Sequence, residues 1–293
     1  MPRLIANGIE IEYETMGHPS DQPLLLIMGL GAQLITWDDG FCRELADRGF
    51  YVIRFDNRDA GLSTKMEEAG PADVLGAFQG NGGAAYTLDD MADDAVGVLG
   101  ALEIAAAHIV GASMGGFIAQ LVAINHPGRV LSLTSIMSGP GGEDAVPPTS
   151  EAAALLVQPP AATRDGLIDQ RVAGARVMVG VANPLDAARV RRQAERAYDR
   201  SYYPAGYGRQ LVASLVAPSR VTGLSSVKVP TLVVHGIDDP LIPLDNGRRT
   251  AAAVPGARLI ELKGMGHNVP ESYWPLVADA IAETARRANV ART

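Results

Sequence analysis

The sequence predicts an α/β fold: a mostly parallel sheet with helices on both faces and one helical insertion. Short, continuous apolar runs recur along the chain, which is typical of strands buried on both faces of a parallel sheet. Helical stretches separate most of these runs, so βαβ crossovers are expected to join the strands. The expected strands of this sheet are 24–28, 51–55, 106–110, 130–137, 229–236 and 257–262.

The chain opens with a hairpin signal. Asn7-Gly8 separates the strand-like runs LIA and IEIEYE, and Asn-Gly favours the tight turn of antiparallel strands. Thr87 suits the N-cap of a helix that runs to about 102. Residues 64–86 show no clear period and are expected to form a loop or a short excursion. Further helices are expected at about 37–49, 117–125, 245–253 and 273–288.

Strands and helices stop alternating between Ser138 and about Ser226. A segment rich in proline and glycine leads into alanine- and arginine-rich helical stretches with no strand-like run. We therefore expect an α/β core made of residues 1–138 and 227–293. Residues 139–226 are expected to form a helical insertion in that core.

Composition and the pattern of apolar residues argue against several classes of function. The 293 residues carry a net charge of −8 and no run of lysine or arginine, which disfavours a surface for nucleic acid or anionic membranes. Cys42 is the single cysteine, so no intramolecular disulfide or cysteine-based metal cluster is expected. The N-terminus has no signal-peptide pattern, and the longest apolar stretch, 23–35, is broken by glycines and too short for a bilayer. We expect a soluble, cytoplasmic protein without a metal or cofactor.

A candidate nucleophile lies between an expected strand and an expected helix. Gly111-Ala112-Ser113-Met114-Gly115 matches the pattern G-x-S-x-G. A serine on such a tight turn has an unfavourable backbone conformation, and the residues two positions away must lack side chains. The helix N-terminus favours developing negative charge. The alternative is a glycine-rich turn with an N-capping serine.

The base is expected to be His267. A serine hydroxyl needs a base to take its proton, the base needs an orienting acid, and the expected chain order is serine, acid, histidine. Four of the five histidines precede the expected acid, and His267 alone follows it, on a glycine-rich loop after a strand. Three of the other four are interpreted as a core residue, a helix-end residue and a support for the acid loop: His108, His126 and His235.

The acid is expected at the carboxyl end of strand 229–236. Asp238 and Asp239 both lie there. We favour Asp239, because it directly precedes Pro240 and proline stiffens the loop that must aim the carboxylate. A distant alternative follows strand 130–137, at Glu143 or Asp144.

Two backbone N–H groups are expected to bind the oxyanion of acyl transfer. One belongs to Met114, directly after the nucleophile. The other is assigned to Leu30, in the glycine-rich loop after strand 24–28, where Gly29 permits close approach to the substrate. Trp37 is a candidate wall of the acyl pocket, and core packing is an equal alternative for it.

Six segments resemble the α/β-hydrolase superfamily over essentially the full chain: LLLIMGLGAQ, IRFDNRDAGLST, YTLDDMADD, IVGASMGG, LVVHGIDDPLIP and LKGMGH. They look most similar to actinobacterial esterases of the aclacinomycin methylesterase and mycobacterial LipG types. The resemblance implies an eight-stranded sheet, a helical cap over the site and ester hydrolysis without a cofactor. It assigns the triad to Ser113, Asp239 and His267, and the second oxyanion donor to Leu30. It also implies a structural turn at 56–58.

One departure concerns the residue before Gly29. Many relatives carry His-Gly where this chain has Met28-Gly29. Because the expected donor is a backbone N–H, the change should leave the oxyanion site intact. It argues against the broader His-Gly subfamilies.

We expect a carboxylic ester hydrolase that acts through an acyl-enzyme on small esters, including thioesters, with short- to medium-chain apolar acyl groups. The same triad also serves carbon–carbon bond hydrolases, lactonases and perhydrolases. A non-catalytic ligand-binding protein on the same fold is the alternative of another class.

Four arginines of the insertion could bind an anionic headgroup, although a solvated helix face is the simpler interpretation. They are Arg189, Arg191, Arg192 and Arg196.

Overall fold

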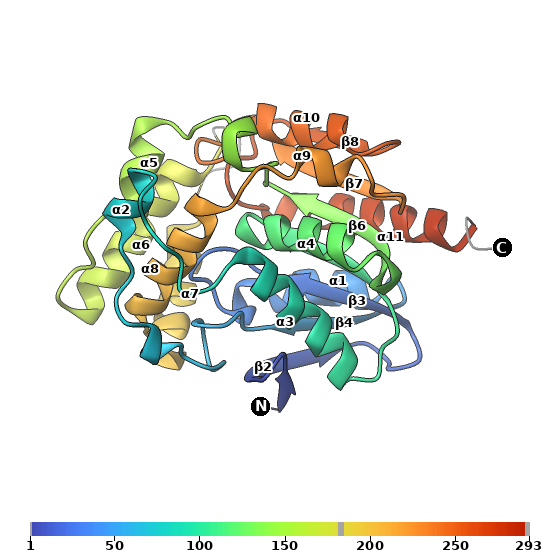
Figure 1. The fold of residues 1–293 in the computed structure, drawn as a ribbon, viewed down its shortest axis with the longest axis horizontal. Helices are drawn as coiled ribbons and strands as arrows, with labels where there is room; N and C mark the ends of the chain where they lie inside the picture. The colour runs from blue at the N-terminus through green and yellow to red at the C-terminus, as the bar shows by residue number, and fades with distance from the viewer. Residues whose placement is uncertain (1, 181–184, 291–293) are drawn as a thin grey trace.

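The computed structural model describes residues 2–180 and 185–290, and within them eight strands form one sheet (Figure 1). The strand order is β1-β2-β4-β3-β5-β6-β7-β8. β1 and β2 pair antiparallel, β2 pairs antiparallel with β4, and the remaining pairs are parallel. The strands are β1 Arg3–Ala6, β2 Ile9–Met16, β3 Gln22–Ile27, β4 Phe50–Phe55, β5 Ala107–Ala112, β6 Val130–Ile136, β7 Thr231–Gly236 and β8 Arg258–Leu262. The predicted mostly parallel α/β sheet is confirmed.

The hairpin and the Thr87 cap both form as the sequence predicts. Asn7 and Gly8 have φ of 48° and 79°, and positive φ at both central residues is the requirement of a type I′ turn. The Thr87 side chain accepts from the Asp90 N–H, and the Asp90 carboxylate accepts from the Thr87 N–H. This reciprocal capping box fixes the start of α3.

Two helical layers cover the sheet. On one face lie α3 (Leu88–Ala101), α4 (Met114–Asn125) and α10 (Leu244–Ala253), and on the other lie α1 (Asp39–Ala46) and α11 (Trp274–Val290) (Figure 1). Each face has its own apolar core: Ile109, Ile118 and Leu133 belong to the first, and Leu26, Val110 and Ile281 belong to the second. Alternate residues of β5 therefore serve both cores, as expected for a strand covered on both sides.

Helices fill the chain between β6 and β7 in the described residues. They are α5 (Ser150–Leu156), α6 (Arg164–Met178), α7 (Ala187–Arg200), α8 (Pro204–Val216) and α9 (Val221–Leu224). Figure 1 shows α5 to α8 gathered at one end of the sheet, together with the short helix α2 (Val74–Phe78). Helix α2 lies within the stretch 64–86, where the sequence predicted a loop or a short excursion and no helix was identified. We refer to residues 139–226 as the helical insertion.

The order in which the chain adds strands to the sheet reverses at β3. The chain passes from β3 to β4 on one side, then returns to place β5 on the other side. Ile27 at the end of β3 pairs with Gly111 near the end of β5, so the loops that leave these two strands lie side by side. Ligand sites of open α/β sheets form at such switch points, beyond the carboxyl ends of the strands.

No helix in the described part of the chain is long and apolar enough to cross a membrane.

Candidate active site

Ser113 lies on the turn between β5 and α4 in a conformation that few residues adopt. Its φ is 57° and its ψ is −125°, and a positive φ is rare for any residue with a side chain. Hydrogen bonds hold the turn on both sides: the Ser113 N–H donates to the Ile136 carbonyl over 2.9 Å, and the Ser138 hydroxyl donates to the Ser113 carbonyl over 2.9 Å. These hydrogen bonds therefore hold the strained backbone conformation of Ser113.

The glycines of the motif are required by close backbone contacts. A Cβ on Gly111 would lie 2.0 Å from the Gly115 carbonyl oxygen, and one on Gly115 would lie 2.1 Å from the Ile27 carbonyl oxygen. Neither contact can be relieved by moving a flexible side chain. The sequence argument that the residues two positions from the serine must lack side chains is thus confirmed.

The structure brings Ser113, His267 and Asp239 into one hydrogen-bonded chain. His267 Nε2 lies 3.0 Å from Ser113 Oγ, and His267 Nδ1 lies 2.8 Å from Asp239 Oδ2. The Asp239 side chain is fully buried and the His267 side chain is 10% exposed. This geometry suits transfer of the serine proton to the imidazole while the carboxylate orients the ring.

The carboxylate of Asp239 is aimed by its own loop after β7. Its Oδ1 accepts from the N–H groups of Leu241 and Ile242, over 2.9 and 2.8 Å, which leaves Oδ2 for His267. The preceding Asp238 uses its backbone N–H to bind the Met265 carbonyl over 3.0 Å. Of the two aspartates that the sequence offered, Asp239 is the one whose carboxylate contacts His267.

His235 supports this acid loop, as the sequence predicted. Its Nε2 lies 2.7 Å from the Ile242 carbonyl oxygen and 3.7 Å from Asp239 Oδ2. The nitrogen that faces a carbonyl must carry the proton, so the ring is the Nε2–H tautomer when neutral. Burial lowers the pKa of His235, which favours this neutral state.

The two expected oxyanion donors lie beside Ser113. Met114 begins helix α4 directly after the serine, and a Cβ built on Gly29 would lie 3.4 Å from Ser113 Oγ, which places the loop of Leu30 against the hydroxyl. Within the described residues, neither the Leu30 N–H nor the Met114 N–H donates to a protein acceptor. The Asn57 side chain donates to the Met28 carbonyl over 2.9 Å and so anchors the start of this loop.

Trp37 lies in the apolar core between the sheet and α11. It is 4% exposed and stacks on Phe41, with 5.8 Å between ring centroids. These contacts agree with the packing alternative. Its use as a wall of the acyl pocket stays a prediction.

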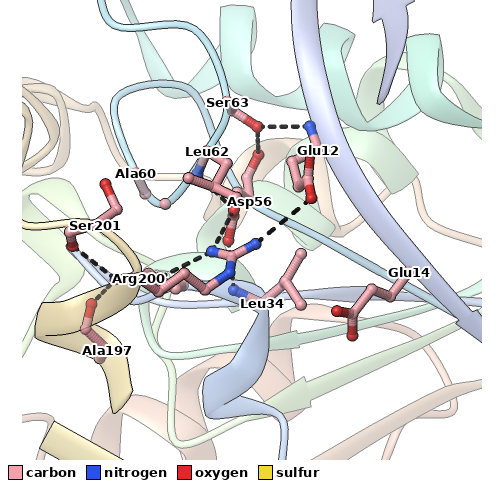
Figure 2. A network of polar contacts seen from close by, with 12 residues as sticks. Glu12, Glu14, Leu34, Asp56, Ala60, Leu62, Ser63, Ala197, Arg200 and Ser201 are labelled. Atoms are coloured by element: carbon pink, nitrogen blue, oxygen red, sulfur yellow. Dashed lines mark hydrogen bonds and ion pairs between the residues drawn. The ribbon is translucent and has the colours of Figure 1, made fainter. Parts of the chain in front are cut away.

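The helical insertion is tied to the core by a buried arginine that the sequence reading did not single out. Figure 2 shows Arg200, at the end of α7, reaching between Asp56 and Glu12. Arg200 lies 2.7 Å from Asp56 Oδ2, and Glu12 lies at 4.0 Å, with all three side chains at most 8% exposed. Asp56 also accepts from the Leu34 N–H over 2.7 Å, in the segment that follows the Leu30 loop.

A second buried pair joins α8 to the core. Arg209 Nε and Nη2 donate to the two oxygens of Asp59 over 2.8 and 2.9 Å. Burial alone would raise the pKa of Asp59, but the hydrogen bonds from Arg209, the Met66 N–H and Tyr86 outweigh it and hold that pKa below its ordinary value. The segment 56–59 thus contacts the insertion as well as the sheet. The family resemblance implied only a structural turn here.

The insertion also touches the backbone of the candidate base. The His267 N–H donates to the Met178 carbonyl at the end of α6 over 2.7 Å. Close packing requires glycine on both sides, because a Cβ on Gly266 would lie 2.1 Å from that carbonyl oxygen and one on Gly180 would lie 2.1 Å from the Gly264 carbonyl oxygen. Helix α6 therefore helps to fix the position of His267.

The arginines of α7 are largely neutralised. Arg189 binds Asp38 and Glu271, each over 2.8 Å. Arg191 pairs with Asp169, and Arg196 lies 3.8 Å from Asp39. Arg191, Arg192 and Arg196 are exposed, as the solvated-face interpretation predicts, whereas the Arg189 side chain is only 25% exposed and bridges the insertion to the core. Recognition of an anionic headgroup stays a prediction.

Other histidine, cysteine and carboxylate side chains that the sequence singled out lie outside the hydrogen-bonded chain and contact structural partners. His108 is buried between Ser132 and Gln22, and His126 caps the end of α4 and contacts Asp93. Cys42 is buried, which raises the pKa of its thiol to about 11. Asp144, one of the two residues of the distant alternative acid site, binds Ser219. Among the residues that the structure describes, no group of three or more histidine, cysteine or carboxylate side chains is placed to hold a metal ion.

Comparison with known proteins agrees with this architecture. A family described as alpha/beta hydrolase fold matches residues 22–272. The chain is 32% identical to rhodomycin D methylesterase DnrP of Streptomyces peucetius, over 98% of this chain and 99% of that protein. It is also 32% identical to rhodomycin D methylesterase DauP of a Streptomyces species, over 94% and 95%.

Solved structures with low sequence identity share the fold. A meta-cleavage product hydrolase from Pseudomonas fluorescens is 22% identical, with a TM-score of 0.77 over 98% of both chains. An enol-lactonase from Burkholderia xenovorans is also 22% identical, with a TM-score of 0.72 over 99% of this chain and the whole of that chain.

Proposed function

This chain belongs to the α/β-hydrolase fold family and is an ester-hydrolysing enzyme, and on that premise we propose that Ser113 is its nucleophile, His267 its base and Asp239 its orienting acid. The observation that carries the proposal is the hydrogen-bonded chain from Ser113 Oγ through both ring nitrogens of His267 to Asp239. The strained backbone of Ser113 supports it, because such strain clusters at reactive groups.

The mechanism is acyl transfer in two halves. Ser113 Oγ bonds to the acyl carbon while its proton passes to His267 Nε2, and the carbonyl electrons move to the oxygen that the Leu30 and Met114 N–H groups bind. The tetrahedral species expels the alcohol, which leaves with the proton from His267. Water then attacks the acyl-enzyme by the same route and releases the acid and free Ser113.

The proposed substrates are small, uncharged esters with short- to medium-chain apolar acyl groups, including thioesters. Similarity to two methylesterases over almost the whole chain supports methyl esters, so methanol is a proposed leaving group. We propose residues 139–226 as a cap over the site, which is supported by the contact of α6 with the His267 backbone. The proposed setting is the cytoplasm, and no cofactor is needed for this chemistry.

The test is hydrolysis of p-nitrophenyl esters from acetate to palmitate, with one methyl ester followed by acid release. Wild type should turn over at least one chain length, and Ser113→Ala should lose about 10³-fold or more in kcat/KM because the nucleophile is gone. An active Ser113→Ala variant contradicts the proposed nucleophile. No turnover by wild type on any ester would redirect the assignment to carbon–carbon bonds, lactones or perhydrolysis.

A further inference from the structure

The proposed oxyanion donor Leu30 lies in a four-residue turn. The Ala32 N–H donates to the Gly29 carbonyl over 3.2 Å, which closes a turn from Gly29 to Ala32. Gly31 has φ of 64°, whereas Leu30 is not among the residues with positive φ. Positive φ at the third position alone defines a type II turn.

A side chain of the helical insertion binds the central peptide of this turn. Gln210, on α8, is fully buried. Its Oε1 accepts from the Gly31 N–H over 2.7 Å, and its Nε2 donates to the Arg58 carbonyl over 2.7 Å. Both ends of the amide are therefore satisfied, and the group has one orientation.

This contact anchors the turn at its central peptide. Types I and II differ by a flip of the central peptide, here the one between Leu30 and Gly31. A flip would turn the Gly31 N–H away from Gln210 and leave a fully buried amide oxygen without its donor, which is costly. Tyr207, one turn earlier on α8, packs where a Gly31 side chain would be: a Cβ there would lie 2.5 Å from Tyr207 Cδ2.

We propose that Gln210 is a positioning residue for the oxyanion site: by binding the Gly31 N–H it anchors the turn of residues 29–32 and so holds the preceding residue, Leu30, in place beside Ser113. The inference rests on the proposed function, since it assigns a partner to the same site. It makes α8 of the insertion a part of the catalytic arrangement. Donors that are aimed in advance stabilise an oxyanion without reorganisation during the reaction.

The test compares Gln210→Met, which keeps an unbranched side chain of similar size and removes both hydrogen bonds, with wild type. Ser214→Ala is the matched control: it removes a hydrogen bond one turn along the same helix, to the Gln210 carbonyl, and does not touch the turn. Active sites are counted from the burst of p-nitrophenol released by diethyl p-nitrophenyl phosphate, so that kcat refers to folded sites.

Gln210→Met should lower kcat per titrated site by roughly 10- to 100-fold, somewhat less than outright removal of an oxyanion donor. KM should change by less than about threefold, and the affinity for a trifluoromethyl ketone, which forms the tetrahedral oxyanion, should fall in parallel with kcat/KM. Ser214→Ala should match wild type. A Gln210→Met enzyme with unchanged kcat per site overturns the proposal.

Gly31→Ala disturbs the same turn without changing Gln210. The positive φ of position 31 strains an alanine, and the new Cβ would collide with the Tyr207 ring. This variant keeps the proposal testable if Gln210→Met does not fold, and it should show the same loss of kcat per titrated site. Unchanged kcat per site in this variant also overturns the proposal.

Failure of the proposed function has a different signature. In that case wild type itself would give no burst and no ester turnover. An active wild type and an inactive Ser113→Ala variant, together with a fully active Gln210→Met variant, would overturn the positioning role alone.

Discussion

The two turns that meet at the site are built in different ways. The turn of Ser113 is marked in the local sequence, because Gly111 and Gly115 permit contacts that any side chain would block, and hydrogen bonds with Ile136 and Ser138 then hold it. The turn of Leu30 is held from outside: Asn57 binds its start, and Gln210, 179 positions away from Gly31, binds its centre. The comparison teaches that both turns need tertiary contacts, but that only the turn of the proposed nucleophile carries a five-residue pattern by which the sequence alone reveals it.

The largest expected effect comes from the acid that orients the base. Asp239→Asn should lower kcat by about 10⁴-fold, because the amide cannot hold His267 in the tautomer that accepts the serine proton. Asp238→Asn is the matched control and should stay within a few-fold of wild type, since the contact that the structure gives to Asp238 is through its backbone. Steady-state kinetics on the best ester decides between them. Equal losses in both variants would contradict the assignment of the acid.

This comparison also shows what could be read from the sequence. Ser113, Asp239 and His267 each stand in a short pattern of glycine or proline after a strand, so their positions and order could be predicted. Arg200 stands in the arginine-rich helix α7, Arg209 and Gln210 stand in α8, and their partners lie 144 to 179 positions away. No local pattern identifies which of several arginines is buried.

The elements of the fold divide in the same way, into those with a local sequence cause and those without one. The hairpin at Asn7-Gly8 and the helix start at Thr87 have local causes and were predicted. Helix α2 was missed, because five residues give too little periodicity to recognise. For Trp37, an apolar ring near the site has the same sequence signature whether it faces substrate or packs on Phe41.

A smaller effect, on stability, probes the link between α8 and the core. Arg209→Met should lower the free energy of unfolding by roughly 3–5 kcal/mol, because it leaves the buried Asp59 carboxylate without its cation. Arg164→Met breaks an exposed arginine–aspartate pair in the same insertion and should change stability little. Urea unfolding measures both. Equal stabilities of the two variants would show that the buried pair does not anchor the insertion.

The smallest expected effect concerns His235 beneath the acid loop. Burial holds its pKa below the ordinary value of 6.5 in the folded protein, so the unfolded chain binds a proton there more readily. Its contribution to stability is complete above about pH 6.5 and is lost as pH falls from there towards the folded-state pKa, with a slope of at most about 1.4 kcal/mol per pH unit.

His235→Gln provides the control for this pH dependence. Glutamine can still donate to the Ile242 carbonyl but cannot take up a proton in this range. Urea unfolding of both proteins between pH 8 and 5.5 should show a steeper loss of stability in wild type than in the variant. Parallel curves would mean that His235 does not titrate differently in the folded and unfolded chains.

The central claim, that Ser113 is the nucleophile of this enzyme, is tested most directly by covalent labelling. Wild type treated with diethyl p-nitrophenyl phosphate should gain one diethylphosphoryl group, found on the peptide that contains Ser113 by mass spectrometry, and His267→Ala should be labelled far more slowly. Ser113→Ala should gain none. A label on another residue, or equal labelling of wild type and Ser113→Ala, would contradict the account.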